Sequence, residues 1–206
     1  MLAIIDYGVG NLFSLKSSLK AIGAECIVTD DPEVIKSADK IILPGVGAFE
    51  DAIDKLRKTG LDKLIIDLAN SGKPLMGICL GMQLLFEKSY EYGCHEGLGL
   101  IKGDILPFEG KIPSKLKIPH IGWNALFDFK KDCPLFKYVS EGEHVYFVHS
   151  FFAEKDIDAR AASCEYGTVF SAAVMKDNIF ACQFHPEKSG DTGLNILRGF
   201  CEIGEK

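Results

Sequence analysis

A cysteine flanked by two glycines is the residue best placed to act as a nucleophile in this sequence. Residues 73–86 read KPLMGICLGMQLLF, in which an apolar run leads into Gly77, Cys79 and Gly81 and a helix is predicted to start at once. A strand that turns into a helix through Gly-x-nucleophile-x-Gly is a nucleophile elbow, where a Cβ at either glycine would collide with neighbouring backbone. Cys79 would then lie at a helix N-terminus, which favours the thiolate. The alternative is a buried cysteine in an ordinary strand–helix turn, which is the better explanation for a cysteine without a partner.

A histidine and a glutamate near the other end of the sequence supply such a partner. The segment QFHPEKS places His185 after an apolar strand, and Pro186 prevents that strand from continuing. His185 is therefore expected at a strand terminus, where parallel sheets carry their active sites. Glu187 follows closely enough to orient the imidazole and to stabilise its protonated form. A loop histidine beside a surface glutamate is the alternative for this motif alone, but together with Cys79 the simpler interpretation is a Cys-His-Glu catalytic triad.

The elements that must position these residues follow an α/β pattern in the first half of the chain. Strands are predicted at 2–6, 25–29, 40–43 and in the apolar run before Cys79; helices are predicted at 12–22, capped by Asn11 and ended by Gly23, and at 32–37, 48–58 and 61–70. Strands and helices that alternate with short connections predict a mostly parallel sheet covered on both faces.

The second half of the chain has a different pattern. Residues 93–117 are rich in glycine and proline, with a strand candidate at 99–106. Further strands are predicted at 144–152, 159–164, 169–175 and 179–184, joined by hairpin-type turns at 165–167 and 176–178, and a closing helix is predicted at 192–203. We therefore expect an α/β fold with an antiparallel β extension in the second half, and the length suits one domain over residues 1–206.

Composition excludes several classes of function. A net charge of −6 and a pI near 5.4 argue against a nucleic-acid surface. Seven cysteines without a Cys-x-x-Cys pair indicate reduced thiols rather than a disulfide framework or a zinc site, and His95, His120 and His144 lack metal-ligand spacing. The N-terminal MLAIIDYG has no basic lead and no long apolar run follows, so we expect no signal peptide, no membrane association and a cytoplasmic location.

Two motifs together resemble those of the class I, or triad, glutamine amidotransferase family. They are GICLGMQ at 77–83 and FHPE at 184–187. More narrowly, the blocks IDYGVGNL, PGVGAF, PHIGWN, YFVHSF and HPEKSG, at 5–12, 44–49, 119–124, 146–151 and 185–190, resemble the glutaminase subunits of imidazole glycerol phosphate synthase from histidine biosynthesis. These blocks span almost the whole chain. The resemblance implies a three-layer, flavodoxin-like α/β fold.

The resemblance also implies a reaction and a role for each triad residue. Cys79 would attack the side-chain carboxamide of L-glutamine to form a γ-glutamyl thioester. His185, oriented by Glu187, would pass a proton to the departing ammonia and then activate the water that releases glutamate. No cofactor or metal is implied.

The resemblance assigns the oxyanion and substrate positions as well. In the family, the oxyanion is held by the N–H that follows the nucleophile, here that of Leu80, and by one from a glycine-rich turn, here at Gly45 and Val46. The positions that match those holding glutamine are Gly47, Gln83 and the backbone of His149, Ser150 and Phe151. An ordinary strand–helix turn explains the glycines at 44–47 equally well. If the turn is functional, glycine lets a peptide rotate so that its N–H enters or leaves the oxyanion site, and we expect activity to depend on a partner that sets this peptide.

Several weaker signals in the sequence have ordinary structural explanations. The Gly8 and Gly10 turn lacks the third glycine of a dinucleotide fingerprint, because Phe13 stands there. Ser150 lacks the setting of a serine nucleophile and is better explained as part of a strand, and Cys182 is better explained as a core residue. In the subfamily, the Gly8 and Gly10 turn with Asn11 lies near the partner subunit, and a tight turn explains it equally well. Positions like Trp123 and Lys188 contact the partner in the subfamily, although roles in the core or at the solvent surface explain them almost as well.

The partner implied by the resemblance is a (β/α)₈ cyclase subunit that forms a heterodimer with this chain. It would use the ammonia to convert the nucleotide PRFAR into imidazole glycerol phosphate and AICAR. Three alternatives remain open from the sequence: the same glutaminase serving another synthase, such as one for surface-sugar amidation; a free-standing Cys-His-Glu hydrolase of peptides or γ-glutamyl bonds; and an inactive binding module, which would be expected to lack a triad residue.

Overall fold

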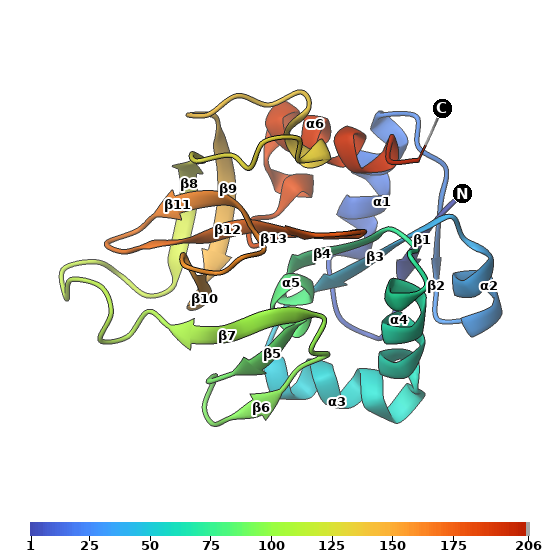
Figure 1. Cartoon of the computed structure of the whole chain (residues 1–206), viewed down its shortest axis with the longest axis horizontal. Helices are drawn as coiled ribbons and strands as arrows, with labels where there is room; N and C mark the ends of the chain where they lie inside the picture. The colour runs from blue at the N-terminus through green and yellow to red at the C-terminus, as the bar shows by residue number, and fades with distance from the viewer. Residues whose placement is uncertain (205–206) are drawn as a thin grey trace.

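An eleven-stranded mixed sheet runs through the computed structural model, which describes residues 1–204 (Figure 1). Its strand order is β2-β1-β3-β4-β13-β12-β10-β7-β5-β6, and β11 pairs with β12 outside this path. The parallel half contains β2 (Cys26–Thr29), β1 (Leu2–Ile5), β3 (Lys40–Gly45), β4 (Leu75–Cys79) and β13 (Ile179–Cys182). The rest is largely antiparallel: β12 (Val169–Lys176), β11 (Arg160–Glu165), β10 (Phe151–Glu154), β7 (Ile101–Pro107), β5 (Phe86–Ser89) and β6 (His95–Glu96). The predicted fold class is confirmed.

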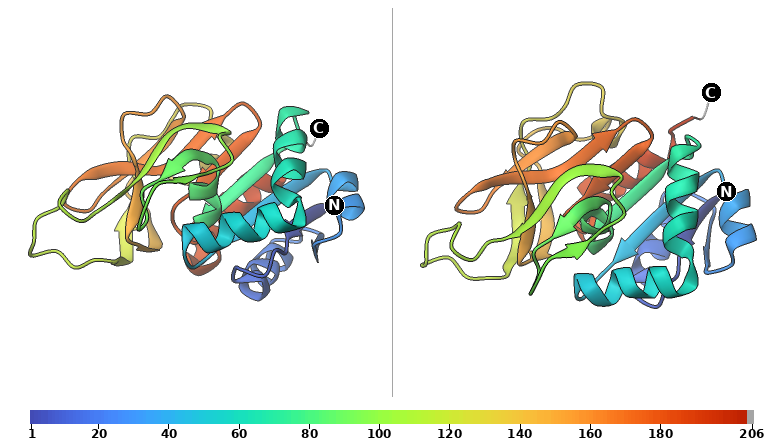
Figure 2. Two further views of the ribbon diagram at one scale, coloured as in Figure 1. Left: turned by 90° about the horizontal axis from the view of Figure 1, so that it is seen from below. Right: turned by 60° about the horizontal axis from the view of Figure 1, so that its bottom comes forward.

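Helices cover both faces of this sheet and give the fold three layers (Figure 2). On one face, α1 (Leu12–Ala21) and α6 (Gly190–Cys201) contribute Leu19 and Phe200 to one apolar core. On the other face, α2 (Pro32–Ser37), α3 (Phe49–Thr59) and α4 (Leu61–Asn70) contribute Ile35, Leu56 and Ile65 to a second core. Strands β1, β3, β4 and β13 are buried along their whole length, as expected for parallel strands covered on both sides.

A separate two-stranded sheet packs beside the antiparallel half. It consists of β8 (His120–Ala125) and β9 (His144–His149), which pair antiparallel. The strand predicted over 144–152 was therefore wrong as a single element, because the chain leaves the small sheet at Ser150 and joins the central sheet as β10. The Ser150 carbonyl accepts the Phe108 N–H at 3.0 Å, and Phe151 then pairs with Pro107 of β7. Ser150 is thus a link between two strands rather than part of one.

Several other boundaries differ from the prediction. The helix after the elbow, α5, contains only residues Leu80–Leu84, because the Leu84 and Leu85 carbonyls accept backbone N–H groups from the 98–101 segment instead of continuing the helix. Asn11 stands at the start of α1, but its side chain makes no capping hydrogen bond. Helix α6 begins at Gly190, two residues before the predicted start. Strands β5, β6 and β8 and the 3₁₀ turns η1 (Pro134–Phe136) and η2 (Pro186–Lys188) were not predicted.

Candidate active site

The backbone at Cys79 has the conformation of a nucleophile elbow. Cys79 is the last residue of β4, and its φ of 54° and ψ of −113° lie outside the regions that non-glycine residues usually adopt. A Cβ on Gly77 would lie 2.8 Å from the Gly81 carbonyl oxygen, and a Cβ on Gly81 would run into the Leu43 carbonyl of β3. Both glycines are therefore required by close backbone packing, as predicted.

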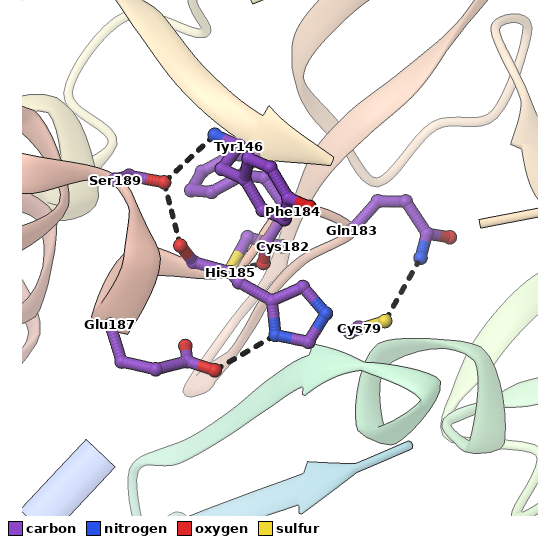
Figure 3. A network of polar contacts seen from close by, with 8 residues as sticks. All are labelled: Cys79, Tyr146, Cys182, Gln183, Phe184, His185, Glu187 and Ser189. Carbon is purple, nitrogen blue, oxygen red and sulfur yellow. Dashed lines mark hydrogen bonds and ion pairs between the residues drawn. The ribbon is translucent and has the colours of Figure 1, made fainter. Parts of the chain in front are cut away.

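His185 reaches the same sheet edge because β13 lies directly beside β4. The two strands are parallel, with Cys182 opposite Ile78, so the residues that follow them leave the sheet at the same end. The His185 N–H donates to the Tyr146 carbonyl of β9 at 2.9 Å. The Ser189 hydroxyl donates to the His185 carbonyl at 2.6 Å and accepts the Tyr146 N–H at 2.9 Å (Figure 3). This bridge ties the histidine loop to the small sheet.

Glu187 and His185 form a buried pair. His185 Nδ1 lies 2.8 Å from Glu187 Oε1, and their side chains are only 2% and 4% exposed. Since the carboxylate can only accept, the proton of this bond is on Nδ1, and Figure 3 shows the imidazole between Glu187 and the Cys79 sulfur. Nε2 makes no hydrogen bond within residues 1–204. Burial on its own lowers the pKa of His185, but interaction with Cys79 and Glu187 outweighs it and raises the pKa to about 10.

A pocket of about 280 Å³ opens over Cys79 and His185. The other residues that line it are Val46, Gly47, Leu80, Gln83, Glu91, Tyr92, Pro119, Val148, His149, Ser150 and Phe151. All of the predicted oxyanion and substrate residues except Gly45 therefore line this pocket. Gly45 lies at the end of β3, directly opposite Cys79 in the sheet register.

The glycine-rich turn after β3 is held by a residue that the sequence did not single out. The buried Tyr7 hydroxyl donates to the Pro44 carbonyl at 2.9 Å. A Cβ on Gly45 would lie 2.7 Å from that hydroxyl and 2.9 Å from the Gly81 nitrogen, so the turn packs directly on the elbow. Gly47 has a φ of +96°, which favours glycine. Burial raises the pKa of Tyr7, so the phenol stays a hydrogen-bond donor.

Glu91 and Tyr92 are pocket residues that were also missed. Glu91 is the only acidic residue that lines the pocket, and its Oε2 accepts the Phe49 N–H at the start of α3 at 2.7 Å. Burial raises the pKa of Glu91. In the sequence both residues stand in a polar, glycine-containing stretch that resembles an ordinary surface loop. Only the fold brings them to the pocket.

Two glutamine amides connect the pocket wall to the nucleophile. Gln83 Nε2 donates to the Phe151 carbonyl at 3.1 Å and to Gln183 Oε1 at 2.9 Å. Gln183 Nε2 in turn donates to Cys79 Sγ at 3.7 Å (Figure 3). Because both hydrogens of the Gln83 amide face acceptors, its oxygen is left available to the pocket. Gln183 was not singled out as a site residue, although it stands in the histidine motif.

The three residues that the resemblance places near a partner lie on β8, on η2 and in the loop before α1. Trp123 on β8 is 54% exposed and lies edge-on to the Tyr146 ring, 6.2 Å between centroids. Lys188 lies over the same ring, 5.8 Å from its centroid. Asn11 precedes α1, a helix that packs against η2. Cys182, predicted to be core, is fully buried.

The part of the chain that the structure describes offers neither a metal site nor a membrane span. No group of three or more His, Cys, Asp or Glu side chains there is arranged to hold a metal ion. None of the helices in this part of the chain is long and apolar enough to cross a membrane.

Comparison with known proteins identifies the family. The profile of the family described as glutamine amidotransferase class-I matches residues 3–202. The chain therefore belongs to the class-I glutamine amidotransferase family. Its fold agrees with a crystal structure of a glutamine amidotransferase (TM-score 0.75, 18% identity, 98% of this chain and 97% of that one) and with PurLQS from Thermotoga maritima (TM-score 0.72, 22% identity, 98% and 97%).

Within the family, curated relatives of one kind match nearly the whole chain. It is 51% identical over 206 residues to the imidazole glycerol phosphate synthase subunit HisH of Caldanaerobacter subterraneus subsp. tengcongensis, covering 98% of each chain. It is 47% identical over 207 residues to the HisH subunit of Syntrophotalea carbinolica (98% of this chain, 100% of that one) and 48% identical over 208 residues to that of a Geobacillus species (100% and 98%).

Proposed function

We propose that this chain is the glutaminase subunit of an imidazole glycerol phosphate synthase and hydrolyses L-glutamine to glutamate and ammonia. The observation that carries the proposal is the strained Cys79 elbow in one pocket with His185, whose imidazole is paired with the buried Glu187. Identity of about half the residues to HisH subunits over nearly the full length supports the choice of synthase.

In the proposed reaction, Cys79 Sγ attacks the carboxamide carbon of glutamine as a thiolate. The proton held by His185 passes to the nitrogen of the tetrahedral intermediate, and the C–N bond breaks to leave a γ-glutamyl thioester and ammonia. His185 then takes a proton from water, which attacks the thioester and releases glutamate. Glu187 keeps the imidazole in the tautomer that presents Nε2 to the reacting atoms.

The oxyanion of both intermediates would be stabilised by backbone N–H groups. The N–H of Leu80 follows the nucleophile at the start of α5, and the turn containing Gly45 and Val46 lies against the elbow. Rotation of one peptide in that turn would bring a second N–H to the oxyanion. We propose that the synthase partner sets this peptide, so that glutamine is hydrolysed when the ammonia can be used.

The pocket suits an amino acid with an uncharged amide side chain. Glu91 is its only carboxylate apart from the triad, and it can pair with the α-ammonium group of glutamine. The free oxygen of Gln83 supplies an acceptor for the same end of the substrate. The volume of about 280 Å³ is small for a ligand site, which disfavours long peptides.

We propose that the partner is a (β/α)₈ cyclase subunit that covers the mouth of this pocket. Ammonia, like other amines, is largely protonated and non-nucleophilic near pH 7, so it must travel through a sealed interface. Trp123 and Ile121 of β8 and Val46 of the oxyanion turn are exposed apolar residues near the site and suit such an interface. Trp123, Lys188 and Asn11 are proposed as partner contacts.

The test is covalent labelling by a glutamine-derived electrophile, followed by peptide mapping. We expect label on Cys79, none in Cys79→Ala, and none on the exposed Cys94, which serves as the internal control for general thiol reactivity. Label on Cys94 instead of Cys79 would contradict the proposed site. Glutamine hydrolysis is then measured alone, with the cyclase subunit, and with the cyclase and its nucleotide.

Hydrolysis rates also distinguish the proposed function from the free-standing hydrolase and from a glutaminase that serves another synthase. Faster hydrolysis of γ-glutamyl peptides than of glutamine indicates a free-standing hydrolase. Glutaminase stimulation by a synthase for another product, and not by the cyclase, indicates a different acceptor. Equal rates with and without the cyclase and nucleotide would overturn the idea that the partner sets the oxyanion turn.

A further inference from the structure

Two buried histidines face each other at the edge of the pocket, where His149 is one of the lining residues. His120 of β8 and His149 of β9 are register partners, with His120 Nδ1 3.0 Å from His149 Nε2. His149 Nδ1 lies 2.8 Å from the Phe151 carbonyl oxygen. Their exposed fractions are 3% and 6%. Neither imidazole takes part in the proposed proton transfers.

The geometry of these contacts fixes the tautomer of each ring. A carbonyl oxygen can only accept, so His149 carries its hydrogen on Nδ1 and, when neutral, has a bare Nε2. His120 must then donate from Nδ1 to that nitrogen, which leaves its own Nε2 as an acceptor. Asn124 Nδ2 lies 3.5 Å from it and also donates to the Glu165 carbonyl at 2.8 Å, so the amide presents its hydrogens in the required direction.

The surroundings keep both rings neutral. His120 lies between the stacked rings of Tyr166 and Phe147, with centroids 4.1 and 4.9 Å away. His149 contacts Phe108, with a centroid distance of 5.1 Å. Burial among these rings lowers the pKa of His120 to about 4 and that of His149 to about 3. A charged form of either ring would break the directed chain of hydrogen bonds.

This series of hydrogen bonds ends at the Phe151 carbonyl oxygen, which also holds the Gln83 amide that faces the pocket. The Phe151 carbonyl accepts from His149 Nδ1 and also from Gln83 Nε2, at 2.8 and 3.1 Å. The second hydrogen of the Gln83 amide goes to Gln183. The position of the Phe151 carbonyl therefore determines which way the Gln83 amide points, and a flipped amide would present hydrogens to the substrate instead of an oxygen.

We propose that His120 and His149 are positioning residues for glutamine hydrolysis. Both rings are neutral and protonated on Nδ1, and together they hold the Phe151 carbonyl and, through it, the Gln83 amide. The proposal rests on the proposed function, because it takes glutamine as the substrate. The two Nδ1–H tautomers do not depend on which substrate is bound.

The first test is ¹⁵N NMR of the histidine side chains in the full chain at about pH 7. We expect both rings to show the Nδ1–H tautomer, which is the minor form of a free neutral imidazole. His120→Phe, which removes the donor to His149 but keeps a flat ring in the stack, should change the His149 resonances. Assignment of either ring as Nε2–H or as imidazolium in the unmodified chain overturns the proposal.

The second test separates positioning from packing by two substitutions of one residue. His149→Leu removes the donor to Phe151, whereas His149→Asn places an amide N–H near the former Nδ1. With the synthase partner present, we expect Leu to raise KM for glutamine roughly tenfold, the size of one lost buried hydrogen bond, with a smaller change in kcat, and Asn to recover most of the loss. Equal defects in both variants, or a fall in kcat alone, would show a structural role only.

The third test asks whether the effect passes through Gln83. In a Gln83→Leu background, His149→Leu should cause little further loss of kcat/KM, whereas independent effects would multiply and overturn the proposal. Tyr166→Phe is the control, because it keeps the ring stacked on His120. It deletes a hydroxyl that donates to the Lys117 carbonyl and takes no part in the hydrogen bonds from His120 to Gln83, so kcat and KM should be unchanged. Absence of glutamine hydrolysis by the unmodified complex overturns the proposed function too; hydrolysis insensitive to His149→Leu overturns only the positioning role.

Discussion

The hydroxyl of Tyr7 is a small group whose removal should change how the enzyme depends on its partner. Tyr7→Phe deletes one buried hydrogen bond, 2.9 Å long, to the Pro44 carbonyl, and opens a small gap beside Gly45, where the hydroxyl now fills the space that a Cβ would need. A buried hydrogen bond of this kind contributes about 1 kcal/mol net, and the stranded carbonyl adds to its loss, so we expect the free energy of unfolding to fall by about 1–2 kcal/mol. The freed turn should reach the oxyanion geometry more often without help.

The assay is glutamine hydrolysis alone and with the proposed cyclase partner and its nucleotide, together with urea unfolding. We expect the rate without partner to rise several-fold and the stimulation by the partner to shrink. Tyr166→Phe is the matched control, because it deletes a hydroxyl that donates to the Lys117 carbonyl at the same distance on the exposed side of the protein. It should leave both rates unchanged. Unaltered stimulation in Tyr7→Phe would refute the role given to this hydroxyl.

Three further predictions concern strain, packing and protonation. Cys79→Gly should abolish glutamine hydrolysis and yet raise the free energy of unfolding by roughly 1 kcal/mol in urea, because relief of the positive φ exceeds the entropy cost of glycine; a less stable variant would contradict this. Gly81→Ala should cost more than about 2 kcal/mol through its backbone clash, whereas Gly60→Ala, at a φ of +73° in open space, should cost only about 1 kcal/mol; equal losses would argue against the clash. His120 and His149 take up protons near pH 6.5 when unfolded but only near 4 and 3 when folded, so their contribution to the free energy of unfolding is fully present above pH 6.5. The free energy of unfolding should therefore fall by several kcal/mol as the pH is lowered from 6.5 towards 4, measured by urea unfolding at each pH; a slope that His149→Leu does not reduce would contradict the assignment.

The sequence predicted the parallel half of the sheet and the geometry around the triad because both depend on local signals. Buried parallel strands read as short apolar runs, and Gly77 and Gly81 mark a tight turn in which neither of these two positions has room for a Cβ. His185 and Glu187 are two positions apart, so one bent loop brings them together. Each of these signals can be read from a short stretch of sequence, and only the approach of His185 to Cys79 depends on a distant neighbour, through the pairing of β13 with β4.

The features that were missed all depend on a tertiary partner. The buried side of β8 carries His120, a polar residue whose hydrogen bonds are satisfied across the small sheet, so the strand shows no alternating apolar pattern. The break at Ser150 occurs within a run of strand-forming residues because β10 pairs with another strand. Tyr7 and Glu91 look like a turn residue and a loop residue until the fold places them beside the elbow.

The position of β13 between β4 and β12 has a consequence for biosynthesis. As the nascent chain leaves the ribosome, strands β1 to β4 can pair at once, but the second side of β4 stays open until residues 179–182 emerge. A ribosome stalled before that point holds a fragment whose β4 edge is apolar and unpaired, which favours aggregation. In the same fragment the Cys79 thiol has no histidine beside it, so the fragment cannot release ammonia.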